Sequence, residues 1–335
     1  MDAAANNGEI ENGIRGKGSI KEVLILLLAS TVLYQLGLSV LVYIAPLMTY
    51  AVKHGKLKAA LLMLVELLVI SGIELIKGGV PEIGNTQSLI SFALCLYFPL
   101  SLSAAGIVWL YASGKRVVQR IVLSLIPFVV ISVIYIVPFA VDRALLAETY
   151  SLYNDAFASL VGPIMEPLVG EFDWSIMFTT VMLTIFSILL PTMAVAVCAT
   201  CFIYETAKHS KESGWEERVR RFSFGSNAIW FLIGAWALVL LNYFISTPAY
   251  VPVILLNIAL TSVVLFACEG FSVLYVNVWK KRHEVKSMQL FLVLAIIAML
   301  IPGLNILIIF GLPLMGVLES FFDMKKIGVT NEDYS

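Results

Sequence analysis

The chain has 335 residues, of which 60% are hydrophobic and 13% are charged, and its formal net charge is −1. Soluble domains contain about 45–50% apolar and about 25% charged residues. The composition therefore excludes a soluble globular enzyme, a disordered chain and a nucleic-acid-binding protein, and it predicts an all-α bundle of transmembrane helices.

The N-terminal residues 1–22 are rich in Asn, Gly, Ala and Glu, which predicts a flexible cytosolic tail. The apolar run that begins at Val23 leads directly into another apolar run, so we expect a retained membrane anchor and no cleaved signal peptide. Long apolar segments then alternate with polar connections: 23–49, 57–76, 88–112, 117–141, 174–204, 226–245, 251–279, 288–301 and 306–322.

The first apolar segment is too long for one span and too short for two full spans. Gln35, Gly37 and Ser39 interrupt it, which predicts two short helices over 23–36 and 39–52 with a break near Gly37. The total is then about ten crossings with both termini in the cytoplasm. A single tilted helix over 23–49, and hence one crossing fewer, is the alternative.

The basic residues orient this arrangement. The basic residues gather in the two terminal segments and in every second connection between apolar segments, including the first residues of the next segment. Only Lys77 and Arg143 lie elsewhere. Cytoplasmic loops are enriched in Lys and Arg, so these alternate connections are expected to face the cytoplasm. We expect one transmembrane domain over residues 23–326, followed by a C-terminal tail over 327–335.

The segment 142–173 contains six acidic residues and only one basic residue, and we place it outside the cytoplasm. Its apolar residues recur at helical spacing from Leu145 to Val161, and Pro163 and Pro167 are expected to end the helix. One interpretation is an amphipathic helix on the outer surface; the other is a lid over an external vestibule that attracts cations.

The cytosolic connection 206–224 is basic, with Trp215 available for the membrane interface. This pattern predicts attraction to anionic lipid. Docking of a cytosolic protein partner is the alternative role of this connection.

Two carboxyl groups interrupt predicted spans and are the main candidates for a ligand or proton site. Glu66 lies at the centre of the segment 57–76, and Glu269 shares a helix face with Ser262 and Ser272. Intramembrane carboxyl groups mark binding sites or proton relays, or join helices by hydrogen bonds. Further polar candidates near or within the spans are Asn242, Asn257 and Asn305.

The chain carries no H-E-x-x-H, G-x-S-x-G or phosphate-loop motif, so we predict no catalytic residues and no enzymatic activity. Cys198 and Cys201 form a C-x-x-C within an apolar run without further ligands nearby, which favours helix packing over zinc binding. We expect no metal and no cofactor. The three histidines, His54, His209 and His283, lie in the basic cytosolic connections and are expected to be solvated loop residues.

The C-terminal spans carry a resemblance to a known family. Residues 269–280 and 311–326 resemble the closing spans of the YybS-like family of bacterial multi-pass membrane proteins of unknown function. In that family the last helix runs Gly-x-x-Asp and then Phe-Asp-aromatic-Arg, with Met324 replacing the aromatic residue here. The matching positions, with acid-for-acid and base-for-base changes, are Gly316, Glu319, Phe322, Asp323 and Lys325.

This resemblance covers residues 174–327 in sequence and the first half only in hydropathy. The family is grouped distantly with the S components of energy-coupling-factor transporters and with MreD-like shape proteins. The first helix lacks the Ala-x-x-x-Ala surface by which S components dock, a departure that argues against energy-coupled uptake.

The resemblance and the polar candidates together predict a transport-related or small-molecule-binding component of the bacterial cytoplasmic membrane. Its expected partners are the lipid bilayer, a small-molecule substrate and membrane or cytosolic proteins. The alternative function is a non-enzymatic, MreD-like scaffold that organises partners in the membrane. An intramembrane enzyme is disfavoured because the chain lacks a catalytic set.

Overall fold

The computed structural model describes residues 19–79, 86–169, 173–209, 222–225, 227–245, 247–248, 250–275, 304–322 and 324. Helices account for nearly all of these residues, and none of the described residues forms a strand. Several predictions fall wholly or mainly outside the described residues: the tail 1–22, the central part of the connection 206–224, the span 288–301 and the tail 327–335.

Five of the described helices are long and apolar enough to cross a membrane: α4 (Lys56–Gly78), α5 (Thr86–Tyr111), α6 (Val117–Val141), α8 (Trp174–His209) and α11 (Tyr250–Leu274). The expected all-α fold is confirmed for the described residues, and the five helices are compatible with an integral membrane protein. The count of ten crossings and the cytoplasmic location of both termini stay predictions.

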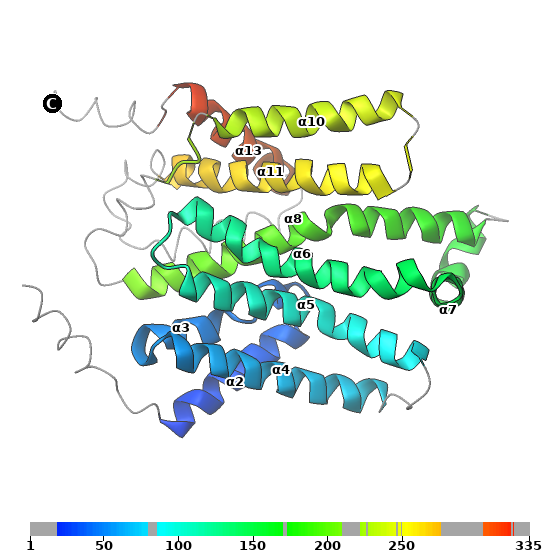
Figure 1. Cartoon of the computed structure of the whole chain (residues 1–335), viewed down its shortest axis with the longest axis horizontal. Helices are drawn as coiled ribbons and strands as arrows, with labels where there is room; N and C mark the ends of the chain where they lie inside the picture. Colours follow the sequence, from blue (N-terminus) through cyan, green and yellow to red (C-terminus); the bar gives the residue numbers. More distant parts are fainter. Residues whose placement is uncertain are drawn as a thin grey trace, which may run out of the picture. The chain divides into compact units, whose positions relative to one another are not determined.

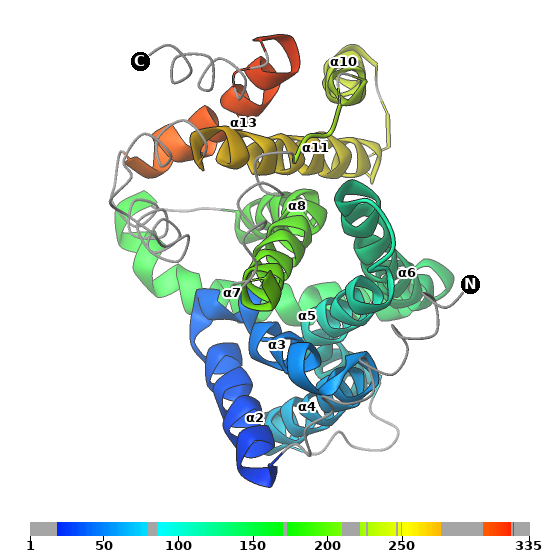
Figure 2. The same cartoon turned by 90° about the vertical axis from the view of Figure 1, so that its left-hand side faces the viewer.

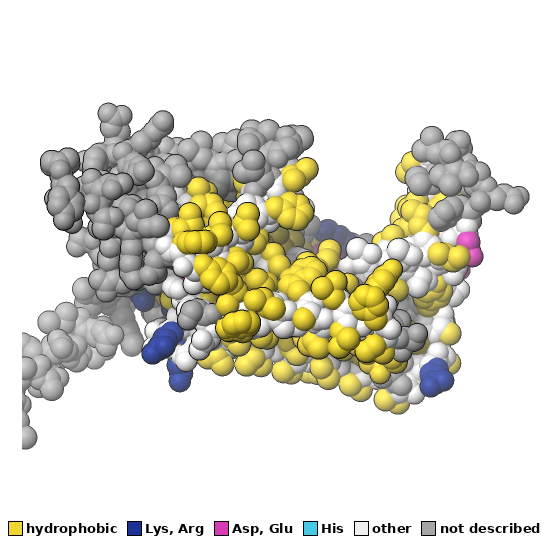
Figure 3. Space-filling view, turned by 90° about the horizontal axis from the view of Figure 1, so that it is seen from above, with side chains coloured by type: hydrophobic (Ala, Val, Ile, Leu, Met, Phe, Trp, Pro, Cys, Tyr) yellow, Lys and Arg dark blue, Asp and Glu magenta, His cyan; other side chains and the backbone are white. Residues whose placement is uncertain are grey.

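Hydrophobic side chains make up much of the molecular surface, as expected of helices that face lipid. Along α6, for example, Val133 is 55% exposed and Ile134 is 60% exposed. On the face drawn in Figure 3, hydrophobic side chains cover most of the described surface. Lipid tails solvate such side chains without cost, whereas backbone polar groups must be satisfied within the helices themselves.

The chain divides into two compact units, one formed by residues 1–185 and 195–208 and the other by residues 186–194 and 209–335. Besides α4–α6 and both ends of α8, the first unit contains α2 (Ile20–Gln35), the 3₁₀ helix η1 (Gly37–Val42), α3 (Ala45–His54) and α7 (Arg143–Val169). The second contains the middle of α8, α10 (Ala228–Phe244), α11 and α13 (Leu304–Phe322).

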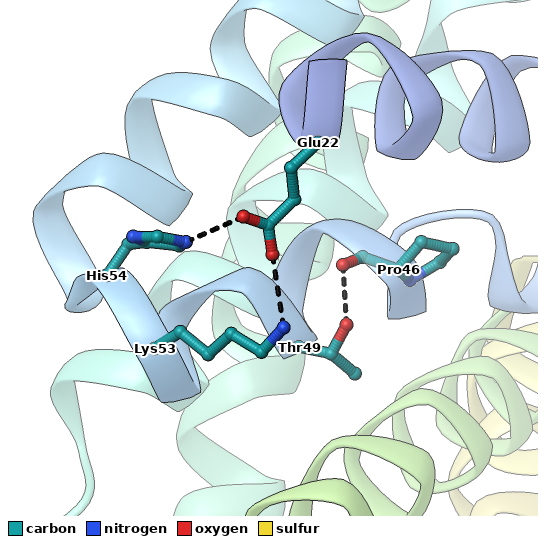
Figure 4. A network of polar contacts seen from close by, with 5 residues as sticks. All are labelled: Glu22, Pro46, Thr49, Lys53 and His54. Atoms are coloured by element: carbon teal, nitrogen blue, oxygen red, sulfur yellow. Dashed lines mark hydrogen bonds and ion pairs between the residues drawn. The ribbon is translucent and has the colours of Figure 1, made fainter. Parts of the chain in front are cut away.

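The predicted break near Gly37 is present. Gly37 has a φ of 57°, in the left-handed region that glycine adopts without steric cost, and α2 ends just before it. The chain then returns through η1 and α3, so that Glu22 at the start of α2 contacts Lys53 and His54 at the end of α3 (Figure 4). The start of α2 and the connection between α3 and α4 therefore lie at the same end of the hairpin.

The predicted helix of the acidic segment is α7, which runs across the direction of α5 and α6 and is seen end-on in Figure 1. It packs on the start of α8, where the Phe157 and Phe178 rings are 5.7 Å apart. The prediction that Pro163 and Pro167 end this helix is wrong, because α7 continues to Val169. A proline removes one N–H donor but keeps a helical φ, so the remaining hydrogen bonds can carry the helix past it.

Candidate functional site

Glu66 is fully buried on α4, with 0% of the residue exposed. The Thr31 hydroxyl of α2 donates a hydrogen bond to its Oε1 at 3.0 Å. The second oxygen, Oε2, is also buried and has no hydrogen-bond partner among the described residues. One carboxyl oxygen is thus hydrogen-bonded to Thr31, and the other is buried without a described hydrogen-bond partner.

The packing of α4 explains why Glu66 faces inward. Met63, Glu66 and Ile70 follow one another at helical spacing and each has 0% exposure, so they share the face that packs against α2, α3 and α5. Figure 2 shows α2, α3 and α4 gathered side by side. Of the described residues, none forms an ion pair with Glu66, and a charged carboxylate without a partner is costly in such an environment.

A second polar cluster lies between the C-terminal ends of α2 and α4. The Tyr34 hydroxyl donates to Glu74 Oε1 at 3.3 Å, and Lys77 Nζ lies 3.4 Å from the same oxygen. Lys77 also donates to the side-chain carbonyl of Gln35. Only 15% of the Glu74 side chain is exposed, whereas 53% of the Lys77 side chain is exposed, so the cluster connects the helix interface to the surface.

A third polar cluster lies at the opposite end of α2. The Glu22 carboxylate is 3.2 Å from Lys53 Nζ and 3.1 Å from His54 Nε2, and Thr49 donates to the Pro46 carbonyl beside them (Figure 4). Hydrogen bonds from His54 and then from Lys53 lower the pKa of Glu22 below its usual value. This cluster holds the start of α2 against the end of α3.

The prediction of solvated histidines is wrong for two positions. His54 is 6% exposed and His209 is 5% exposed. His54 packs against the ring of Tyr50 with centroids 4.2 Å apart. Each of them is the last residue of its helix, and the basic composition of the following connection gave no sign that the side chain is buried.

Glu269 belongs to the second unit and is 1% exposed on α11. Ser262 and Ser272 are also buried, so the predicted polar stripe lies inside the unit and does not face lipid. The Ser262 hydroxyl donates to the Ala259 carbonyl at 2.6 Å. Because Glu66 and Glu269 belong to separate compact units, their convergence on one cavity stays a prediction.

Two glycines allow α11 and α13 to pack with their backbones in direct contact. A Cβ atom on Gly270 would lie 1.8 Å from the Leu312 carbonyl oxygen, and one on Gly316 would lie 2.0 Å from the Phe266 carbonyl oxygen. Only glycine fits at such a crossing. The structure therefore gives Gly316, the first residue of the C-terminal motif, a packing role.

The other motif residues differ in their surroundings. Glu319 is 8% exposed, whereas Phe322 is 62% exposed at the end of α13. Asp323 and Lys325 lie outside the described residues.

Asn257 on α11 binds two backbone groups of α8 close to Pro191. Its Oδ1 accepts a hydrogen bond from the Leu190 N–H at 2.9 Å, and its Nδ2 donates to the Phe186 carbonyl at 2.6 Å. Leu190 and Phe186 are the two residues that an ordinary helical hydrogen bond would join. The Asn257 amide thus binds both ends of this backbone pair immediately before Pro191, and Nδ2 also donates to the Val253 carbonyl.

Asn242 lies near the C-terminal end of α10. Its Oδ1 accepts a hydrogen bond from the Thr247 hydroxyl at 2.6 Å, which ties the following connection back to the helix. Both asparagines predicted as site residues are therefore engaged in local structure. The side chain of the third, Asn305, is not among those described.

A charged cluster that the sequence did not single out joins α5, α6 and α8. Arg120 Nη1 forms an ion pair with Glu205 at 2.9 Å, and its guanidinium carbon lies 3.9 Å from the centre of the Trp109 ring. The indole N–H of Trp109 donates to the same Glu205 oxygen at 3.2 Å. From the sequence alone, Arg120 is one of several basic residues expected at the membrane interface. The structure shows that it is buried, in contact with Trp109 of α5 and Glu205 of α8.

The described residues contain no group of three His, Cys, Asp or Glu side chains that could hold a metal ion. Comparisons with known proteins give no relative, since no family model, no curated protein and no solved structure matches the chain. The resemblance to the YybS-like family consequently stays a prediction.

Proposed function

We propose that this chain is a transport-related or small-molecule-binding component of the bacterial cytoplasmic membrane, similar to the YybS-like proteins, and that Glu66 is its binding residue. The observation that carries the proposal is that only one oxygen of this buried carboxyl group has a described hydrogen bond. One oxygen accepts from Thr31, and the other is buried with no described partner. An intramembrane carboxyl group in this state is the kind that proton relays and substrate sites employ.

The surroundings favour a ligand that carries a proton or a positive charge. Thr31 supplies a hydroxyl, and no described cation pairs with Glu66. Protonation of Glu66, a bound cation or a ligand with a protonated amine would each lower the free-energy cost of burying the carboxylate. The amides of Asn257 and Asn242 are hydrogen-bonded to neighbouring groups of the protein, so Glu66 is the stronger of the predicted site residues.

The proposal is tested by thermal unfolding of the purified protein in detergent against a panel of amines, amino acids and metal cations. A ligand at about 100 times its Kd stabilises a protein by about 2.7 kcal/mol, which corresponds to an increase in Tm of several degrees. We expect at least one compound to raise Tm in the native chain, and Glu66→Gln to abolish that increase.

The matched control is Met63→Leu, which changes a fully buried side chain on the same face of α4 and keeps its volume. This variant is expected to keep the ligand-dependent increase. If no compound raises Tm, or if Glu66→Gln responds as the native chain does, the binding function is wrong and the scaffold alternative gains.

A further inference from the structure

The polar groups described around Glu66 offer oxygen atoms, from α2 and from the turn between η1 and α3. The Thr31 hydroxyl of α2 donates to Glu66 Oε1 at 3.0 Å, and the neighbouring Ser30 side chain also interacts with the Glu66 carboxyl group. Ser30 in turn donates to the carbonyl oxygen of Tyr43 at 2.8 Å, in the turn before α3. Oxygen atoms are the ligands that hard metal cations prefer.

Hydrogen bonds orient both hydroxyl groups so that their lone pairs stay available. A hydroxyl group has one proton to donate and two lone pairs that accept. Thr31 directs its proton to Glu66. Ser30 directs its proton to the Tyr43 carbonyl, and the Tyr43 hydroxyl is itself anchored 2.7 Å from the Ser103 hydroxyl of α5. The lone pairs of Thr31 and Ser30 can therefore face a cation.

This group of oxygens lies near the middle of its helices and is covered by protein. Ser30 is the eleventh residue of α2 and Glu66 is the eleventh residue of α4, which places each about 15 Å from the start of its helix. That distance is half of a hydrocarbon core about 30 Å thick. Ser30, Tyr43 and Glu66 each have 0% exposure. Such complete cover favours a small ion, because an organic ligand occupies a pocket of about 300–1,000 Å³.

The charge of the site fits a monovalent cation. No described ion pair includes Glu66, and Lys77 at the end of the same helix pairs with Glu74. One positive charge balances one carboxylate, whereas a divalent cation would leave a net charge in an apolar environment. The described residues also lack a group of three His, Cys, Asp or Glu side chains, and Ca²⁺ sites generally combine several carboxylates.

We propose that Glu66, Thr31 and Ser30 bind a monovalent metal cation, for which Na⁺ is the probe. Glu66 Oε2, which is buried and has no described hydrogen-bond partner, supplies the negative charge. The two hydroxyl groups supply neutral oxygens, and the Tyr43 carbonyl positions Ser30. This inference rests on the proposed function, because it names the class of ligand that the Glu66 site takes.

The test is thermal unfolding of the purified full-length protein in detergent, with NaCl exchanged for choline chloride at constant ionic strength. Choline carries the same charge but is too large for a site of this kind, so it controls for ionic strength. We expect Na⁺ to raise the Tm of the native chain to a plateau, and Glu66→Gln to abolish the increase because an amide carries no charge. Thr31→Val is expected to raise the apparent Kd for Na⁺ about tenfold or more.

The matched control is Thr180→Val on α8, whose hydroxyl donates to the Ile176 carbonyl of its own helix. This variant is expected to respond to Na⁺ as the native chain does. A second measurement, the binding of radioactive sodium to the folded native chain, does not depend on the stability of any variant. We expect saturable binding that unlabelled Na⁺ displaces and choline does not.

The cation site would be overturned by equal Tm values in NaCl and choline chloride, by an equal increase in Glu66→Gln, or by the absence of saturable sodium binding. A native response of Thr31→Val would remove Thr31 from the site. In each case, a Glu66-dependent increase in Tm with an amine or an amino acid would leave the proposed function standing.

Discussion

Asn257 is a polar residue whose role depends wholly on what lies opposite it. Its side-chain amide binds the Leu190 N–H and the Phe186 carbonyl of α8, next to Pro191. Water is absent from the hydrocarbon region, so an unpaired backbone group there is costly. A side chain from a neighbouring helix is one of the ways in which membrane proteins satisfy such an interruption.

We therefore expect Asn257→Leu to destabilise the protein by about 1–3 kcal/mol, because it removes the partner of two backbone groups. The free energy of unfolding, measured by titrating the micellar protein with a denaturing detergent, checks this expectation. Asn242→Leu is the matched control and should cost about 0.5 kcal/mol, since it loses one hydrogen bond at a helix end. Equal costs for the two variants would contradict the proposed role of Asn257.

At the scale of the element, α11 and α13 cross closely at two glycines. Among the described glycines, Gly270 and Gly316 have the shortest distances from an added Cβ to a neighbouring helix. The Cβ positions of Gly270 and Gly316 fall within 2.0 Å of backbone carbonyl oxygens, and backbone cannot move aside as a flexible side chain can. Van der Waals packing between small residues is a main source of helix association in lipid. The two glycines are therefore expected to determine the stability of this helix pair.

We expect Gly270→Ala and Gly316→Ala each to destabilise the protein by about 3 kcal/mol, because the two backbones must separate. The control is Gly234→Ala on α10, where a new Cβ would meet nothing within 4 Å. That variant should be neutral or stabilise by up to about 1 kcal/mol, since alanine favours helices. The same detergent titration measures all three, and a neutral Gly270→Ala would show that the crossing is looser than described.

At the scale of the whole molecule, contacts at one end of the first unit bear on the number of crossings. The hairpin of α2 and α3 places Glu22 beside Lys53 and His54, and Lys56 at the start of α4 donates to Ser113 after α5. These contacts bring three predicted cytoplasmic connections to one end of the first unit. They agree with the even number of crossings that the basic residues require before residue 53.

Single cysteines introduced into a cysteine-free variant test this topology in intact bacterial cells. We expect Ser19→Cys, Lys56→Cys and Ser113→Cys to react with a membrane-impermeant maleimide only after permeabilisation. Asp155→Cys on α7, the control for the outer side, should react in intact cells. Reaction of Ser19→Cys and Lys56→Cys from opposite sides would support the alternative with one crossing fewer.

The fold was largely predictable from the sequence, whereas the site was predictable only in part. Apolar segments of spanning length located α4, α5, α6, α8 and α11, and the interruption at Gly37 located the first break. Glu66 could be selected because a carboxyl group at the centre of an apolar segment must face inward. Its partner Thr31 is 35 residues away and could not be selected, because nothing local indicates which helices touch.

Hydropathy and charge are sums over neighbouring residues, and for that reason the sequence by itself determined the membrane class, the segment boundaries and the expected orientation. Partnerships between side chains depend on the rotation of each helix about its axis and on its neighbours. Only the tertiary structure therefore decided that Asn257 binds the backbone of α8 67 residues away, that His54 is buried and that Gly316 lies at a helix crossing. It also decided that one Glu66 oxygen is bonded and that the other has no described partner.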